Sequence, residues 1–352
     1  MKTLRKITIY SNIAVAATLL LTYLIPYLPP HRIGNLSVLA LVTPALFLAN
    51  ILFALYWMFR YKGWVWLSVS VLILGFGYLK LWVQPLKLHP NTDESIKILS
   101  FNARLFNHYH WHKDLQLPEK ISHFFAKENP DVILLQEFYN NQRYYPKNYP
   151  HKSIIVKQKN DKIGLAVFSK FKILKAGSLK FENTTNNAMY ADLLIGNDTL
   201  RFYNMHLESL HLNTDEDNLL HISANDDNFQ HPNNKEKEAL VENISKRFEK
   251  QEDQVQLFIE HKAYSPHKTI VCGDFNNTAY SYIYRRVRGN DLNDAFEEAG
   301  KGFGRTYNFH YFPMRIDFIL PHKSLKVIHF QTHYLELSDH FPLTATFKLA
   351  ND

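Results

Sequence analysis

Cysteine is almost absent from this sequence of 352 residues, in which Cys272 is the single example. One cysteine excludes an intramolecular disulfide, and the absence of a Cys/His cluster argues against a structural or catalytic zinc site. Cys272 lies in the apolar run TIVCGDF. We therefore predict that it is a buried strand residue, because free cysteine is among the most buried residue types.

A net basic charge is also missing from most of the chain. The sequence carries 40 Lys/Arg and 33 Asp/Glu; residues 1–94 hold eight of the former and two of the latter, which leaves 32 and 31 elsewhere. The overall basic charge therefore comes from the N-terminal segment and does not indicate a nucleic-acid-binding surface. A local patch could still exist: Arg285, Arg286 and Arg288 are its candidates, although three arginines on a helix are more often a solvated face.

Charged residues are scarcest in three apolar stretches, at residues 7–28, 36–59 and about 64–82. The first two contain no charge, and the third has only Lys80 near its end. Each approaches the ~20 residues that a helix needs to cross ~30 Å of hydrocarbon, and Tyr and Trp gather at the ends. We predict three transmembrane helices in a membrane domain of residues 1–90, which contacts the bilayer through residues 7–82, followed by one soluble domain of residues 91–352.

Basic residues in the short loops indicate an orientation. With a cytoplasmic N-terminus, the inside carries Lys2, Arg5, Lys6, Arg60 and Lys62. The outside then carries Arg32, Lys80 and Lys87. The excess of positive charge inside, together with three crossings, predicts a multi-pass protein whose soluble domain lies outside the cytoplasm.

Apolar patterns in residues 95–352 predict many strands and two long helices. Strands are expected at 95–101, 131–136, 153–156, 164–169, 189–195, 199–205, 269–272, 315–320, 326–330 and 343–349, and helices at 113–127 and 235–261. Residues 210–234 are polar and indicate a loop or short helices. This order favours a four-layer α/β sandwich, in which two mixed sheets pack face to face with helices outside.

Six short segments end apolar strands with polar side chains that can bind a metal ion or a phosphate. They are Ser100-Phe101-Asn102, Leu135-Gln136-Glu137, Asn204-Met205-His206, Gly273-Asp274-Phe275-Asn276, Arg315-Ile316-Asp317 and Ser338-Asp339-His340. Strand ends at one rim of a sandwich can converge although they are far apart in sequence. We therefore predict that the six segments form a single site.

Three of these residues suit a hard divalent cation. Glu137 and Asp339 offer carboxylates, and Asn102 offers an amide oxygen. Magnesium prefers oxygen ligands and takes few protein carboxylates, so the sequence predicts an Mg²⁺ site, with Mn²⁺ as a possible replacement.

The remaining polar residues suit the hydrolysis of a phosphoester. His340 and His206 can donate to phosphate oxygens, and Asp317 can hold His340 in one tautomer. Asp274 can orient or deprotonate the attacking water, and Asn276 can position Asp274 or the phosphate.

The segments LLQEF, GDFNN, RIDFI and SDHFPL, in that order, resemble the signature of the endonuclease/exonuclease/phosphatase superfamily over about residues 95–350. The resemblance implies a metal-dependent phosphoester hydrolase. It also implies that Glu137, Asn102 and Asp339 lie at the metal. His340, Asp317, Asp274, Asn276 and His206 would then form the catalytic group. The N-terminal helices lie outside the family core and resemble an arrangement seen in bacterial membrane-bound members, which implies the bacterial inner membrane.

The sequence leaves the substrate open. A phosphodiester in nucleic acid and one in a phospholipid or sphingolipid head group both fit, and no protein partner is predicted. A catalytically silent scaffold that keeps the fold is the alternative of a different class. The histidine run HYHWH could bind metal, but a solvated loop is the commoner structure for such a run.

Overall fold

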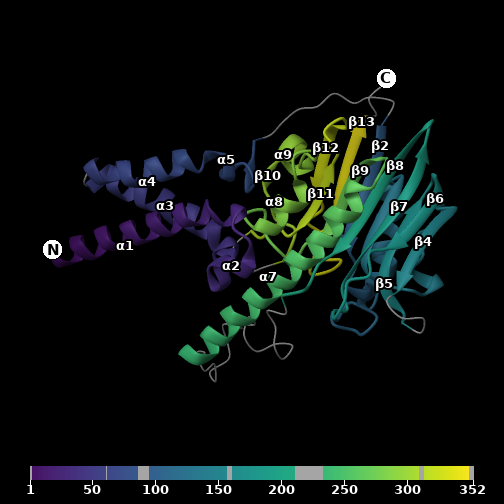
Figure 1. The fold of residues 1–352 in the computed structure, drawn as a ribbon, viewed down its shortest axis with the longest axis horizontal. Helices are drawn as coiled ribbons and strands as arrows, with labels where there is room; N and C mark the ends of the chain where they lie inside the picture. The colour runs from purple at the N-terminus through teal and green to yellow at the C-terminus, as the bar shows by residue number, and fades with distance from the viewer. Residues whose placement is uncertain are drawn as a thin grey trace.

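The computed structural model of the protein describes residues 2–60, 62–85, 95–156, 161–210, 233–308 and 313–348. Within these ranges the chain forms two packed β-sheets, helices on their outer faces, and a group of N-terminal helices that projects to one side (Figure 1). The predicted polar region at residues 210–234 and the connection at residues 84–95 lie mostly outside the described residues.

The first sheet has six strands in the order β12-β13-β2-β3-β5-β4. Strands β2 and β3 are parallel, whereas all other neighbours are antiparallel. The strands are β2 (Ser95–Asn102), β3 (Val132–Tyr139), β4 (His151–Val156), β5 (Ile163–Ser169), β12 (Lys326–Thr332) and β13 (Leu343–Lys348). A strand was predicted in each of these places.

The second sheet has five strands in the order β11-β9-β8-β7-β6, and only β8 and β9 are parallel. The strands are β6 (Lys172–Ser178), β7 (Asn187–Ile195), β8 (Asp198–His206), β9 (Lys268–Asp274) and β11 (Asp317–Pro321). The sequence did not predict β6, because Lys172 and Lys175 interrupt its apolar pattern. Lysines of this kind are typical of an edge strand, where they discourage pairing with another chain.

Apolar side chains of both sheets meet between them and form the central core. Ile98 and Leu134 come from the first sheet, and Met189, Cys272 and Ile319 come from the second. All five are buried, so the prediction of a buried strand position for Cys272 is confirmed.

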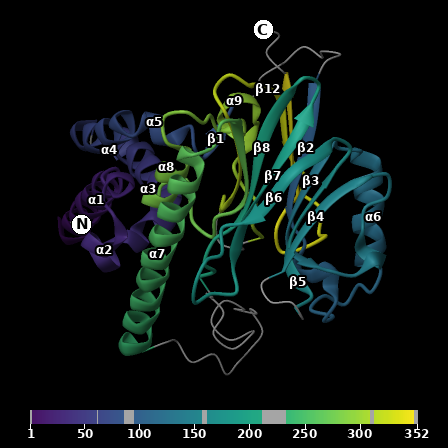
Figure 2. The ribbon, with the colours of Figure 1, turned by 45° about the vertical axis from the view of Figure 1, so that its right-hand side comes forward.

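Helices cover both outer faces of the pair of sheets (Figure 2). Helix α6 (Leu117–Glu128) packs Ile121 and Phe125 on the six-stranded sheet, and it ends where Asn129 adopts a left-handed conformation. Helix α7 (Asn234–Ala263) packs Val255 and Phe258 on the five-stranded sheet. Shorter helices α8 (Tyr282–Arg288) and α9 (Ala295–Ala299) follow β9. Two mixed sheets between helical layers confirm the predicted α/β sandwich.

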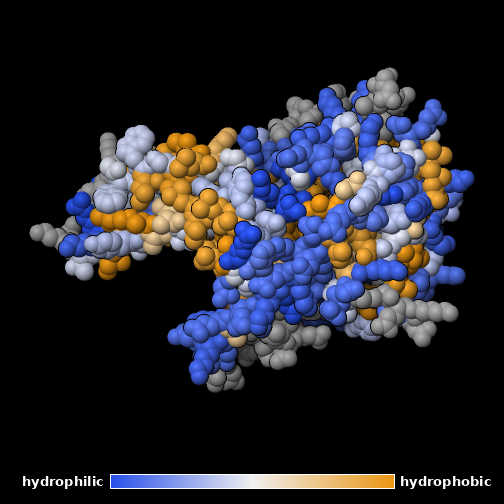
Figure 3. All heavy atoms as spheres, viewed as in Figure 1, coloured by the Kyte–Doolittle hydropathy of each residue, from blue (hydrophilic) through white to orange (hydrophobic). Residues whose placement is uncertain are grey.

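The N-terminal helices are α1 (Lys2–Thr22), α2 (Pro30–Ile33), α3 (Leu39–Arg60), α4 (Lys62–Leu74) and α5 (Phe76–Leu79). Two helical stretches, Thr3–Tyr27 and Pro30–Arg60, are long and apolar enough to cross a membrane. Their most apolar windows are only 22% and 33% buried, so most of their side chains face outward, unlike those of a core helix. Figure 3 shows this apolar surface over the projecting helices.

The prediction of a third transmembrane helix at about 64–82 is wrong. Helix α4 has 13 residues and spans only ~20 Å at ~1.5 Å per residue, well short of a bilayer. The chain then turns toward the sheets, because Gly304 donates its N–H to the Trp82 carbonyl at 2.7 Å and Val83–Gln84 (β1) pairs with Gly302–Phe303 (β10). These hydrogen bonds replace the helical ones at the end of the predicted span.

The predicted orientation loses its basis together with the third span. Three crossings placed the soluble domain outside the cytoplasm, whereas the structure contains two helical stretches of sufficient length in the described residues. Neither the multi-pass arrangement nor the extracytoplasmic orientation is supported by this count.

The N-terminal helices share a core with the outer face of the five-stranded sheet. Ala16, Phe47 and Val71 belong to the same buried cluster as Phe258 and Phe318. A hydrogen bond of 2.9 Å from the Thr278 hydroxyl to the Ala40 carbonyl crosses the same boundary. The two parts of the chain are therefore packed together rather than joined only by the connection at residues 84–95.

Substitution of Gly273 by alanine should destabilise the protein strongly. Gly273 has φ +136°, and a Cβ there would overlap the Met205 carbonyl of the neighbouring strand. We expect a loss of roughly 2–4 kcal/mol, measured as a lower unfolding midpoint of the full chain in detergent. The control is Gly196→Ala, which has φ +62° but open space around the Cβ. Equal effects of the two substitutions would contradict the steric argument.

Candidate functional site

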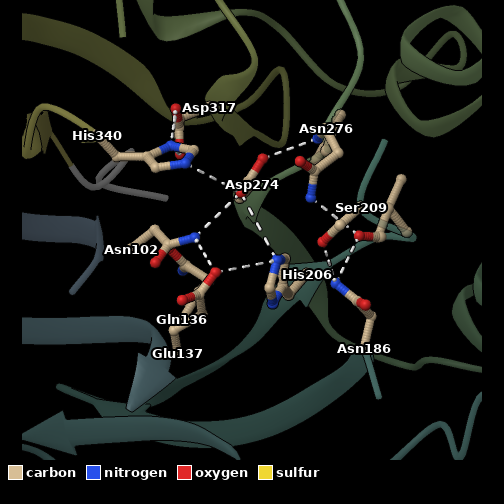
Figure 4. A network of polar contacts seen from close by, with 12 residues as sticks. Asn102, Gln136, Glu137, Asn186, His206, Ser209, Asp274, Asn276, Asp317 and His340 are labelled. Atoms are coloured by element: carbon tan, nitrogen blue, oxygen red, sulfur yellow. Dashed lines mark hydrogen bonds and ion pairs between the residues drawn. The ribbon is translucent and has the colours of Figure 1, made fainter. Parts of the chain in front are cut away.

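The pairing of the strands brings five of the predicted site residues to one rim of the sandwich (Figure 4). Asn102 ends β2, and its partner in the parallel strand β3 is the residue before Glu137. His206 ends β8 opposite Asp274 of β9, and Asp317 begins β11 opposite the same aspartate. Register within each sheet and the packing of the two sheets together place these side chains around Asp274.

A β-bulge turns Glu137 toward this rim. The register of β3 against β5 shifts between Leu135 and Phe138, and Glu137 has φ +46°. A bulge leaves one residue out of the regular alternation of side chains and redirects it. The Glu137 side chain remains 31% exposed, so a ligand can reach its carboxylate.

A pair of buried amides joins the two sheets directly behind the site. Gln136 Nε2 donates to Asn204 Oδ1 at 2.6 Å, and Asn204 Nδ2 donates to the carbonyls of Leu135 and Ala166 at 2.9 and 3.1 Å. Gln136 and Asn204 are both fully buried. Since Glu137 follows Gln136 and His206 lies two residues after Asn204, these bonds fix the distance between the strand ends.

Asp274 Oδ2 lies at the centre of the site. Asn102 Nδ2 donates to it at 3.1 Å, and the same amide donates to Glu137 Oε1 at 3.1 Å. His206 Nε2 lies 3.7 Å and His340 Nε2 lies 3.6 Å from this oxygen. His206 Nε2 is also 3.8 Å from Glu137 Oε1. Donors from both sheets thus face two carboxylates.

Asp317 holds the imidazole of His340 from the opposite side. His340 Nδ1 lies 3.1 and 3.0 Å from the two oxygens of Asp317, which makes Nδ1 the hydrogen-bond donor and directs Nε2 toward Asp274. Thr306 supports this pair, because its hydroxyl oxygen accepts from the backbone N–H of Asp317 at 3.0 Å. The ring of Tyr307 packs 4.9 Å from the imidazole. The predicted Asp317–His340 contact is therefore present.

Burial and neighbouring charge shift the pKa values of the central groups. Burial raises the pKa of Asp274 to about 6, with Asp317 adding to the rise and the two histidines opposing it. Burial alone would lower the pKa of His340, but the carboxylates of Asp317 and Asp274 hold it well above its usual value. The two carboxylates therefore favour the protonated form of the His340 imidazole.

Glu137 and Asp339 form a second concentration of negative charge. Burial raises the pKa of Glu137, and the charge of Asp339 raises it further. Asp339 itself pairs with Arg104, whose Nη1 lies 3.2 Å from Oδ2. Asn102 Oδ1 accepts from the Arg104 backbone N–H at 3.1 Å, so this loop links the two sides of the acidic group. A cation bound here would relieve the repulsion that raises the pKa of Glu137.

Two sets of side chains offer atoms for a cation. One is the predicted set Glu137, Asn102 and Asp339. The other consists of Asp274, Asp317 and His340, whose ligand atoms all lie within 4.8 Å of one another. In the second set Asp317 and His340 already satisfy each other, and a protonated imidazole is a poor metal ligand. The donor chemistry of the site fits a divalent cation, and the first set is the more open of the two.

Asn276 acts through its backbone as well as its side chain. Its N–H donates to Asp274 Oδ1 at 2.8 Å, and its backbone adopts a left-handed conformation with φ +48°. Its amide donates to the Leu207 carbonyl at 3.0 Å, and Asn186 donates to the same carbonyl at 2.9 Å. All eight predicted site residues therefore lie in or beside one site, and Asn276 contacts Asp274; its predicted role of positioning Asp274 or the phosphate stays a prediction.

Several residues of the site were not predicted from the sequence. Arg104, Asn186 and Tyr307 lie in loops whose approach to the strand ends has no local sequence signal. Gln136 directly precedes Glu137 in the run LLQEF, and Asn204 lies two residues before His206 in the run YNMHL. A polar residue within an apolar run is expected to be buried and hydrogen-bonded, and this was the sequence signal that could have identified both amides.

The other sequence candidates have structural contacts. Arg288 pairs with Glu297 at 2.9 Å, and Arg286 donates to Gln256 at 3.2 Å. In the HYHWH run, His108 stacks on Tyr139 with ring centres 3.8 Å apart.

Comparison with solved structures shows the same fold. An endonuclease/exonuclease/phosphatase from Bacteroides vulgatus is 18% identical, with a TM-score of 0.53, and the match covers 73% of this chain and all of that one. A humanized TDP2 from D. rerio is 17% identical, with a TM-score of 0.51, over 72% of this chain and 98% of that one. The mannosyl-6-phosphatase Bt3783 from Bacteroides thetaiotaomicron is 16% identical, with a TM-score of 0.51, over 71% and 98%.

Family models divide the chain in a similar way. A domain of unknown function matches residues 5–82. No curated protein matches the chain. The model of the endonuclease/exonuclease/phosphatase family matches residues 99–340, which is well over half of the chain, and the protein therefore belongs to that family.

Proposed function

We propose that the protein is a membrane-anchored, divalent-metal-dependent phosphoester hydrolase that acts on phosphodiesters of lipid head groups. Its family membership supports phosphoester hydrolysis. The observation that carries the proposal is the convergence of Asn102, His206 and His340 on Asp274 Oδ2, beside the open carboxylate of Glu137.

Glu137, Asn102 and Asp339 would hold the metal ion, with Mg²⁺ or Mn²⁺ as the expected species. Their oxygen donors fit these hard cations. Burial and then the charge of Asp339 raise the pKa of Glu137, and a bound cation would oppose both effects. When bound, the ion supplies charge neutralisation at a phosphate oxygen.

The protein's own residues supply the remaining chemistry. His340, held as a cation by Asp317, presents Nε2–H to a phosphate oxygen, where negative charge grows as water attacks. His206 donates from the opposite side. Asp274, aligned by the N–H of Asn276, is placed to orient the attacking water and accept its proton. The raised pKa of Asp274 makes this carboxylate a stronger base than an exposed aspartate.

The apolar helices support membrane anchoring. Thr3–Tyr27 and Pro30–Arg60 have the required length, and their apolar side chains face outward over the projecting part of the molecule (Figure 3). Aromatic residues such as Tyr27 lie near the ends of these stretches, as is usual at the interface of a bilayer.

The position of the site favours a lipid substrate. The loop that carries Asp274 and Asn276 continues to Thr278, which is hydrogen-bonded to Ala40 at the first turn of α3. With α3 inserted, this end of the helix lies at the level of the lipid head groups. The site is therefore close to phosphodiesters of the bilayer.

Nucleic acid is the less favoured substrate. Binding of its backbone needs several Lys or Arg side chains free to contact phosphates. The candidates were Arg285, Arg286 and Arg288, but the last two contact Gln256 and Glu297, and Arg285 lies over Tyr27 of the N-terminal segment.

Hydrolysis by the full chain in detergent tests the function directly. With Mg²⁺ or Mn²⁺ we expect turnover of phospholipids or sphingomyelin, and little turnover of DNA, RNA or inositol phosphates. EDTA should abolish it. His340→Ala should reduce the rate by roughly 10²–10⁴-fold, because the donor to the phosphate is lost. The control is His123→Ala, an exposed position on α6. Activity on none of the substrates would favour the silent scaffold, and preference for DNA would contradict the lipid proposal.

Replacement of Glu137 by glutamine should weaken metal binding. The side chain keeps its size but loses the negative charge of the carboxylate, whose Oε1 lies 3.1 Å from Asn102 Nδ2. We expect Mn²⁺ affinity, measured by calorimetry on the full chain, to fall by about tenfold or more. Glu119→Gln on exposed α6 is the matched control. Unchanged affinity in Glu137→Gln, with loss in Asp317→Asn, would assign the ion to the Asp274/Asp317/His340 set instead.

Extraction of membranes tests the anchor. The full chain should remain in the membrane fraction after an alkaline carbonate wash and dissolve only in detergent. Leu52→Lys on the outward face of α3 should increase the washed-out fraction, since a Lys at the centre of a span costs about 2.5–3.5 kcal/mol. Leu174→Lys, at a similarly exposed position on β6, should have no effect. Complete release of the unmodified chain would contradict membrane insertion.

A further inference from the structure

A cavity of about 410 Å³ lies between the N-terminal helices and the sandwich. Tyr27, Leu81 and Pro26 line it from the N-terminal segment. The domain that matches the family model, residues 99–340, is called the family domain below. It contributes residues around α8 and the turn between β11 and β12, among them Arg285 and Lys323. None of the eight site residues lines this cavity, so it is separate from the phosphoesterase site.

The cavity lies where the apolar helices end. Tyr27 closes the first apolar stretch, Thr3–Tyr27. Tyr78 lies in α5, directly after the apolar helix α4. Both tyrosines line the cavity, so helix ends from two parts of the N-terminal segment meet at one level. With these helices in a bilayer, that level is the region of the lipid head groups, where tyrosine is enriched.

Two basic side chains give the cavity a net positive charge. The Arg285 guanidinium lies 3.9 Å from the centre of the Tyr27 ring, so a cation–π contact holds it at the wall. Lys323 is exposed in the turn between β11 and β12. No carboxylate of the described residues forms an ion pair with either of them. The third basic residue, Arg288, is neutralised by Glu297, with the two pairs of atoms 3.1 and 2.9 Å apart.

We propose that this cavity binds the head group of an anionic phospholipid at a non-catalytic site. Arg285 and Lys323 contact the phosphate, and the Tyr27 hydroxyl donates to its oxygens or to the glycerol. Tyr78 contributes its ring to the wall, because its hydroxyl already donates to the Tyr23 carbonyl at 2.9 Å. Apolar residues such as Leu81 and Leu292 line the same space, which suits the part of a lipid next to its acyl chains and not a free phosphate. The proposal rests on the membrane anchoring proposed above.

The bound lipid would join the two parts of the protein. Tyr27 and Tyr78 belong to the N-terminal segment, whereas Arg285 and Lys323 belong to the family domain. A head group held by Tyr27, Arg285 and Lys323 against the Tyr78 ring would add to the contacts of the shared apolar core. Anionic lipid would therefore raise the stability of the full chain without taking part in hydrolysis.

Lipid binding by the full chain in detergent tests the proposal. The chain would carry His340→Ala and be kept in EDTA, so that turnover and metal-dependent binding at the catalytic site do not contribute. The probes are short-chain phosphatidylglycerol, short-chain phosphatidylcholine and inorganic phosphate. Calorimetry measures the affinity of the chain for each probe, and thermal unfolding measures the shift that each probe causes in the unfolding midpoint. We expect phosphatidylglycerol to bind at least about tenfold more tightly than phosphatidylcholine and to raise the midpoint.

Substitutions locate the binding. Arg285→Gln and Lys323→Gln should each weaken phosphatidylglycerol binding by about fivefold, as expected for one basic residue near a head group. Arg286→Gln is the matched control, because its side chain contacts Gln256 and does not line the cavity. Normal binding in both cavity variants would overturn the proposal, as would equal affinity for the two lipids. Equally tight binding of inorganic phosphate would identify a free phosphate as the ligand.

The outcome is independent of the test of membrane insertion. A chain that resists the carbonate wash but shows no preference for anionic lipid would contradict only this inference. A chain that is released by the wash would contradict the anchor on which it rests.

Discussion

The buried amide contact between Gln136 and Asn204 is the constraint on which the site depends. It lies in the otherwise apolar space between the sheets, where an unsatisfied amide would be costly, and each amide finds its partner only when β3 and β8 are in one register. A slip of either strand would break the Gln136–Asn204 hydrogen bond and would also move Glu137 and His206 apart. The packing of the core and the geometry of the rim are thus fixed by the same contact.

Charge in the site is arranged in two parts. On one side Asp317 favours the protonated form of His340, and on the other Glu137 and Asp339 concentrate negative charge around an open position. Asp274 lies between them, and its pKa is shifted by Asp317 and by the two histidines. The His340 side would attract an anion, and the Glu137 and Asp339 side would attract a cation. This is the expected property of a site that binds a cation together with an anionic substrate.

The sequence predicted the sandwich and the eight candidate residues that lie together at its rim, because both depend on patterns within single strands: apolar runs, and the polar residues that end them. The roles of these residues stay predictions. The sequence did not predict the bulge and the loops that complete the site. The β-bulge that directs Glu137 comes from pairing with β5, and the approach of Tyr307 to His340 comes from a loop. The prediction of a third transmembrane helix was wrong for a similar reason. Hydropathy depends on composition alone and does not show that Val83 pairs with Phe303.

The shared core between the N-terminal helices and the five-stranded sheet has a consequence for synthesis. Phe47 emerges from the ribosome long before Phe318, its companion in that core, and the strand that carries Phe318 is among the last to be made. Contacts so distant along the chain form late. The inner faces of the early helices must therefore stay covered by lipid or by a chaperone until translation is nearly complete. The helices that are made first thus complete their packing only after the last strands have been made.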